Sequence, residues 1–166
     1  MLLNHARLLR FFTDANEVVG RKKLQKMIYI LKKLGLPFNE KYGFHFYGPY
    51  SEELTLRIEE LCNLGFLTEK EEKKENYIQY HYILNDAGKQ FLDQAQDDLP
   101  ACRDLIEQLN NQSARFLELI ATMLFFDDLT RPEVERKVSE VKAKANYKQE
   151  EFAEAWTFIE QLKQLQ

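Results

Sequence analysis

The segment from Lys23 to Leu54 constrains the fold more than any other part of the chain. A helical pattern ends at Gly35, a short aromatic run follows from Phe44 to Tyr47, and Gly48-Pro49 breaks the chain again before a new helix begins. Glycine favours the left-handed conformation that ends a helix, and proline cannot continue one. The order of helix, break, strand, turn and helix within one short segment predicts a helix-turn-helix.

The flanking residues extend this prediction. Apolar residues recur at helical spacing on both sides of the segment. Residues 66–68 and the alternating run 77–84 are typical of two strands, joined by a charged loop over residues 69–76. Two strands and a loop in this place form the wing of a winged helix-turn-helix. The predicted helices of this part cover residues 2–14, 21–34, 51–64 and 86–96. The expected fold class is mainly α with a small β-wing, an α+β arrangement.

The last third of the chain is predicted to be an α-helical C-terminal extension. A polar run before Pro100 marks the expected boundary between a winged-helix-like domain over residues 1–98 and the extension over residues 99–166. Residues 113–127 are almost all apolar, which is typical of a helix buried on several sides. This helix is expected to complete the core or to face a partner. The extension therefore packs on the first domain or on a partner, and a homodimer through the C-terminal helices is one such arrangement.

Composition argues against several functional classes. The only cysteines are Cys62 and Cys102, so neither a disulfide framework nor a cysteine metal site is expected. No apolar run is long enough to cross a bilayer, and the first residues mix His5 and Arg7 among apolar ones, unlike a secretory signal. No nucleotide-binding, zinc-protease or serine-hydrolase motif occurs. We expect a cytoplasmic protein that is not an enzyme, uses no metal or cofactor, and does not contact a membrane.

Charge is segregated along the chain. Residues 1–47 hold nine Lys and Arg against three Asp and Glu, whereas residues 48–98 hold five against twelve. On helix 21–34, lysines and a tyrosine fall on the face opposite the apolar stripe, where a phosphate or an acidic protein surface could bind. The candidate interaction surface comprises Lys22, Lys23, Lys26, Tyr29, Lys33, Tyr47, Tyr50 and Arg57. A solvated helix face, balanced by the acidic helix that follows, explains the same pattern.

Helix 51–64 would be the recognition helix of a DNA-binding winged helix. Its outward residues include Glu52, Glu59 and Glu60, and only Arg57 and Asn63 suit contacts with bases or phosphates. Repulsion between these carboxylates and DNA phosphates disfavours nucleic-acid binding through this helix. The remaining route to DNA uses the basic second helix and the wing.

Two short motifs carry a resemblance to known proteins. Lys23-Leu24-Gln25-Lys26 and Tyr47-Gly48-Pro49 resemble a pattern of the Panacea-type antitoxins, which are related to the SocA proteolytic adaptor. The resemblance is moderately specific over residues 21–65, and the whole chain is more similar to the YwgA-like proteins of Gram-positive bacteria. The segment from Leu84 to Lys89 also resembles the strand-to-helix junction of winged-helix proteins.

The resemblance implies a bacterial, non-enzymatic, winged-helix-like domain that works by binding protein. Taken with the acidic third helix, it leads us to expect a protein that acts through protein–protein interaction, like an antitoxin or an adaptor. The resemblance does not supply the partner. The alternative is a DNA-binding transcription regulator that uses the basic second helix and the wing.

Overall fold

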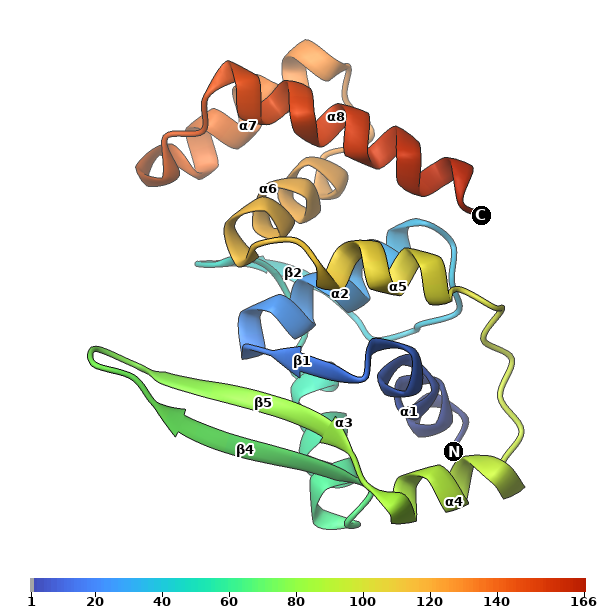
Figure 1. Ribbon diagram of the computed structural model, residues 1–166. Coiled ribbons are helices and arrows are strands. Elements are labelled where there is room, and N and C mark those ends of the chain that lie inside the picture. The colour runs from blue at the N-terminus through green and yellow to red at the C-terminus, as the bar shows by residue number, and fades with distance from the viewer. Residues whose placement is uncertain (1) are drawn as a thin grey trace.

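The computed structural model describes residues 2–166 and shows a mainly helical chain with two small antiparallel sheets (Figure 1). This confirms the expected combination of mainly α structure with a little β. The first part comprises α1 (Leu3–Ala15), β1 (Glu17–Val19), α2 (Arg21–Lys33), β2 (Gly43–His45), β3 (Gly48–Tyr50), α3 (Glu52–Asn63), β4 (Leu67–Lys73), β5 (Ile78–Leu84) and α4 (Asp86–Gln94). The second part comprises α5 (Arg103–Asn110), α6 (Ala114–Phe125), α7 (Arg131–Val141), a 3₁₀ turn (Ala143–Ala145) and α8 (Gln149–Gln164).

Helix α2 lies at the centre of the molecule. Its apolar residues Leu24, Met27, Ile28 and Leu31 are almost completely buried. Burial of one such side chain contributes roughly 1.5–3 kcal/mol relative to exposure. The helix contacts α5, α6, β1 and β3, so neighbours cover most of its circumference and not only its apolar stripe. Because of this placement, not all lysines of α2 are exposed to solvent.

The aromatic run that was predicted as one strand is a hairpin. β2 and β3 pair antiparallel, with Phe44 opposite Pro49, and the turn falls at Phe46 and Tyr47. The prediction that Gly48-Pro49 turns the chain is wrong, because both residues lie in the second strand. Gly48 has a φ of +89°, and a Cβ added there would lie 3.2 Å from Thr122 Oγ1. Glycine meets both constraints because it has no side chain.

The second sheet has three antiparallel strands in the order β1-β5-β4. Its register runs from Leu67 opposite Leu84 to Lys73 opposite Ile78. The predicted charged loop over residues 69–76 is therefore wrong, since residues up to Lys73 pair with β5. Strand β1 was not predicted at all, although its Val18 is fully buried.

Helix α3 begins as the sequence predicts. The Ser51 hydroxyl accepts a hydrogen bond from the backbone N–H of Leu54 at 3.1 Å, which satisfies one of the free donors at the helix N-terminus. Glu52 and Glu53 occupy the first turn, where the helix dipole favours negative charge. Leu54, Ile58 and Leu61 form the buried face, and Cys62 next to them is partly buried.

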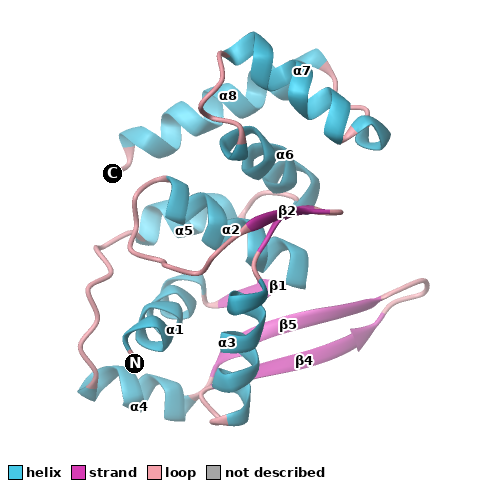
Figure 2. Ribbon diagram, turned by 180° about the vertical axis from the view of Figure 1, so that it is seen from behind, coloured by secondary structure: helices cyan, strands magenta, loops and turns pink. Residues whose placement is uncertain are grey.

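The C-terminal helices pack on the first part of the chain. After α4, an extended segment leads to α5, which contacts α1 and α2 (Figure 2). Helix α6 contacts α2 and β3, and α8 lies against α6. Leu117, Leu119 and Ile120 of α6 are fully buried, so this apolar helix completes the core within one chain. Within residues 2–166, no helix is long and apolar enough to cross a membrane.

Candidate functional site

The predicted basic stripe on α2 does not form one exposed surface. Lys22 is exposed, whereas the Lys23 ammonium donates a hydrogen bond to the carbonyl of Asn110. Lys33 forms an ion pair with Asp127 at 3.1 Å. Helix α2 therefore uses these lysines in different local contacts.

Lys26 and Tyr29 are interior residues, which corrects the prediction that they lie on an exposed face. Their residual exposures are 2% and 5%. The Tyr29 ring packs against Tyr42 and Phe125, with ring centroids 4.9 and 6.3 Å apart. The reason is tertiary: α6 covers the side of α2 that the local pattern assigns to solvent.

The Lys26 ammonium is held at the base of the β2–β3 hairpin. It donates a hydrogen bond to the carbonyl of Pro49 at 2.9 Å. Burial lowers the pKa of this ammonium to about 8, because removal of water disfavours the charged form. The carboxylate of Glu118 opposes that shift in pKa, while the charges of Lys142 and Lys22 add to it.

Gln25 joins α2 to the start of α3. Its side-chain amide donates to the Ser51 carbonyl at 2.9 Å and to Thr55 Oγ1 at 3.1 Å, and its oxygen accepts from the Ser51 N–H at 2.9 Å. With Lys23 and Lys26, this gives the Lys23-Leu24-Gln25-Lys26 motif a structural role. Each polar member bonds to the backbone of another segment, and Leu24 enters the core.

A pocket of about 260 Å³ opens between α2, α3, β3 and the β4–β5 hairpin. Four predicted site residues line it, and four do not. Those that line it are Lys22, Lys26, Tyr47 and Tyr50. Those outside it are Lys23, Tyr29, Lys33 and Arg57. The other lining residues are Arg21, Leu24, Gln25, Leu54, Thr55, Ile58, Glu59, Glu69 and Tyr82.

One wall of the pocket is a closed polar network that sequence reasoning did not assemble. Arg21 donates to Tyr82 Oη at 3.3 Å and to Glu69 Oε1 at 3.2 Å, while the Tyr82 hydroxyl donates to Glu69 Oε2 at 2.6 Å. The Arg21 guanidinium also lies 3.6 Å from the centre of the Tyr80 ring. Burial and the Glu69 carboxylate raise the pKa of Tyr82, so this hydroxyl stays protonated. The contributing residues lie too far apart in the sequence to be associated by spacing.

Exposed aromatic residues border the pocket at the tip of the β2–β3 hairpin. Phe46 is 77% exposed and Tyr47 is 49% exposed, and their rings meet edge to face. The Lys22 ammonium lies 3.5 Å from the centre of the Tyr47 ring. The Lys142 ammonium anchors the tip: it donates a hydrogen bond to the Phe46 carbonyl at 3.1 Å and forms an ion pair with Glu118 at 3.3 Å. The tip is thus both apolar and anchored.

The outward face of α3 is acidic, as predicted. Glu52, Glu59 and Glu60 are exposed, and Leu56 among them is 57% exposed. Together with Phe46 and Tyr47, the residues Glu52, Leu56 and Glu59 make up a surface that we call the hairpin–α3 face. Glu59 and Tyr47 line the same pocket, so the hairpin and α3 both border it.

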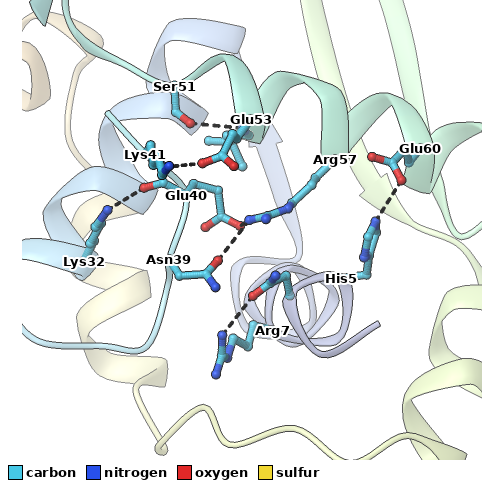
Figure 3. Close-up of polar contacts among 12 residues, drawn as sticks. His5, Arg7, Lys32, Asn39, Glu40, Lys41, Ser51, Glu53, Arg57 and Glu60 are labelled. Carbon is cyan, nitrogen blue, oxygen red and sulfur yellow. Dashed lines mark hydrogen bonds and ion pairs between the residues drawn. The ribbon is translucent and has the colours of Figure 1, made fainter. Parts of the chain in front are cut away.

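Arg57 does not contribute to that face. Figure 3 shows its guanidinium turned toward the loop before β2, where it pairs with Glu40 and donates to Asn39 Oδ1 at 3.1 Å. Glu40 is completely buried, and its Oε1 atom has no hydrogen-bond partner among residues 2–166. The prediction that Arg57 belongs to an interaction surface therefore gives way to a structural role. The pairing could not be read from the sequence, because Glu40 carries no local signal of burial.

Charges on the β4–β5 hairpin largely neutralise one another. His81 lies between Glu17 and Glu72, and the hydrogen bond to Glu17 raises the pKa of its imidazole. Lys74 pairs with Glu72 at 2.7 Å. Residues 67–84 hold three lysines against four glutamates, so the hairpin has no excess of positive charge.

Neither cysteine is activated. Burial raises the pKa of the Cys62 thiol and raises that of Cys102 to about 11. Among residues 2–166, no cluster of His, Cys, Asp and Glu side chains is arranged to hold a metal ion.

Comparison with known proteins gives one clear relationship. No family model matches the chain. A protein of Bacillus subtilis strain 168, named uncharacterized protein YwgA, is 56% identical over 165 residues, covering 99% of each chain.

Proposed function

The chain belongs to the YwgA-like proteins of bacteria, and we propose that it acts without catalysis, by binding another protein through the hairpin–α3 face. The observation that carries this proposal is the exposure of Phe46, Tyr47 and Leu56 on the β2–β3 hairpin and on α3, two of the elements that border the pocket. Exposed aromatic and aliphatic residues that gather beside a pocket are typical of protein-binding surfaces. In this role the protein resembles an antitoxin or an adaptor.

The charges of the face define the partner. Glu52 and Glu59 flank Leu56 on α3, and no ion pair within residues 2–166 neutralises either carboxylate. A complementary protein surface has an apolar hollow for the hairpin tip and a basic rim for these acids. We propose a basic partner of this kind.

The scaffold for this surface is, in our proposal, a winged helix. Support comes from the element order α1-β1-α2-β2-β3-α3-β4-β5, in which the β2–β3 hairpin stands between the two helices, and from the sheet order β1-β5-β4. In that arrangement α3 is the exposed second helix of a helix-turn-helix, and the β4–β5 hairpin is the wing. The Lys23-Leu24-Gln25-Lys26 motif and Tyr47-Gly48-Pro49 then hold the two helices and the β2–β3 hairpin together.

Affinity capture with surface variants tests the proposal. The tagged wild-type protein is compared in its native cells with Leu56→Arg and with Phe46→Ser, both at exposed positions where folding is unaffected. We expect a basic protein that is captured by wild type and reduced at least tenfold by either variant, since exposed apolar anchors dominate such contacts. Val141→Ser, at an exposed position on α7, is the matched control and retains capture. Equal capture by all variants would contradict the proposal.

The alternative function is DNA binding through α2 and the wing, which the winged-helix element order favours. In this arrangement Lys22 is the one exposed lysine on α2 that lines the pocket, while the outer face of α3 is acidic. We therefore expect no salt-sensitive gel shift with duplex DNA at low ionic strength. A shift that weakens steeply as salt rises would support the alternative, because phosphate contacts release counterions.

A homodimer through the C-terminal helices is the alternative assembly. Helix α6 is already covered within one chain, and the exposed apolar residues of the extension are scattered, with Val141 on α7 and Leu165 after α8. We therefore propose a monomer. Sedimentation equilibrium should give a mass near 19.8 kDa, whereas twice that mass would support the dimer.

A further inference from the structure

The pocket beside α2 combines an apolar floor with three basic side chains, Arg21, Lys22 and Lys26. Leu24, Leu54 and Ile58 supply the apolar floor. Of the three cations that line the pocket, Arg21 is paired with Glu69, whereas Lys22 and Lys26 have no carboxylate within ion-pair distance in residues 2–166. Glu59 is the remaining acid of the lining, and it lies exposed on α3.

Lys26 is the unusual member of this lining. The residue is only 2% exposed, and its ammonium has three donors. Within residues 2–166, the Pro49 carbonyl is the one acceptor that it contacts. Burial is the main cause that disfavours the charge of Lys26; the Glu118 carboxylate opposes this effect, and the charges of Lys142 and Lys22 add to it. An anion bound beside Lys22 and Lys26 favours the charged form of both ammonium groups.

We infer that this pocket binds a small monocarboxylate with an apolar body, with the carboxylate beside Lys22 and Lys26 and the body against Leu24, Leu54 and Ile58. The volume of about 260 Å³ lies just below the usual range of ligand pockets, roughly 300–1,000 Å³, and so suits a ligand of small size. A phosphate group suits this pocket less well. The Arg21 guanidinium already donates to Glu69 and Tyr82, so it is not free to form a bidentate contact with phosphate.

This inference goes beyond the proposed protein contact, because the pocket takes its ligand with or without a partner. Tyr47 belongs both to the pocket wall and to the hairpin–α3 face. A bound carboxylate near Lys22 would therefore change the surroundings of the Tyr47 ring, on which the Lys22 ammonium rests. Occupancy of the pocket can in this way adjust the protein-binding face.

Calorimetric titration of the purified protein with phenylacetate tests the inference. Phenylacetamide, which has the same shape without the charge, should bind at least tenfold more weakly, and inorganic phosphate should bind no more tightly than phenylacetamide. Lys22→Gln should weaken phenylacetate about tenfold, the equivalent of one lost charge contact. Lys70→Gln removes the same charge from an exposed position outside the pocket and should leave the affinity unchanged.

The dependence on pH provides a second readout that needs no substitution of a buried residue. Lys26 has a pKa of about 8, so raising the pH from 7 to 9.5 removes its charge and should weaken phenylacetate about tenfold. The charged and titratable groups around it are Lys22 on α2, Glu118 on α6, Lys142 after α7, Arg21, Glu59 and Glu69 across the pocket, and Tyr47, Tyr50 and Tyr82. Lys26→Met, if folded, should bind weakly at every pH.

Two outcomes would overturn the inference. The first is equal affinity for phenylacetate and phenylacetamide, which would make the pocket merely apolar. The second is saturable phenylacetate binding that Lys22→Gln leaves unchanged, which would place the ligand elsewhere. Because these titrations contain no partner, their failure leaves the capture experiment with Leu56→Arg intact, and the reverse also holds.

Discussion

Glu40→Ala is expected to destabilise the protein by about 3–5 kcal/mol, since removal of one partner leaves the other charge of a buried ion pair uncompensated. Glu40 is completely buried, and the side chain of its partner Arg57 is 17% exposed. Figure 3 shows that the same loop is also tied down by Lys32, which donates to the Glu40 carbonyl, and by Glu53, which accepts from the Lys41 N–H. Loss of the carboxylate therefore strains a loop that cannot easily move away.

A second Arg–Glu pair in the same protein provides the control. Arg131 and Glu160 form an ion pair in which both side chains are 56% exposed. Glu160→Ala should cost less than about 1 kcal/mol, as is usual for a solvated pair. Urea denaturation of both variants measures the difference, and equal losses of unfolding free energy would contradict the structural role assigned to Glu40. The double variant Glu40→Met/Arg57→Leu should recover most of the loss, because replacing both charges removes the uncompensated one.

Gln25→Leu is expected to have the second largest effect, about 2–4 kcal/mol, because an orphaned buried N–H alone costs roughly 1–3 kcal/mol and two further hydrogen bonds are lost. The Ser51 N–H, in a residue with no exposed surface, donates to the Gln25 side chain. The Ser51 carbonyl keeps Thr55 as a donor, so the N–H is the group left without a partner. Leucine fills a similar volume, which separates the loss of hydrogen bonds from the creation of a cavity.

The same substitution at an exposed helical position is the matched control. Gln108 on α5 is exposed, so Gln108→Leu should change the unfolding free energy by no more than about 0.5 kcal/mol. Both variants are compared by urea denaturation, with circular dichroism to verify the helix content. If Gln25→Leu proved as mild as the control, the motif around Gln25 would not be the tie between α2 and α3.

The sequence predicted the helices well because each satisfies a local rule. Helix α3 has its Ser51 cap, and α6 has an almost continuous apolar run. The strands were harder to predict. Strand β4 contains Glu69, Lys70 and Glu71, a composition typical of a loop, and only its pairing with β5 makes it a strand. Strand β1 is three residues long, too short for alternation to be recognised.

The candidate site was predicted in part for a related reason. Lys22, Tyr47 and Tyr50 do meet at one pocket, because α2 and the aromatic run are close in sequence and the fold brings them together. Lys26 and Tyr29 were placed on an exposed face because their covering helix α6 lies almost a hundred residues later. Helical periodicity identifies which residues share a face, but it cannot reveal which face a distant segment covers.

Site-specific photo-crosslinking tests the proposed protein contact most directly. A benzophenone amino acid is placed at Phe46, at the exposed tip of the β2–β3 hairpin, or at the control position Leu165, which is 45% exposed after α8. In the native cells, we expect one discrete protein adduct from position 46 that is absent from position 165 and is lost when Leu56→Arg is added. Identical adducts from both positions, or an adduct from position 46 that Leu56→Arg leaves unchanged, would contradict the account.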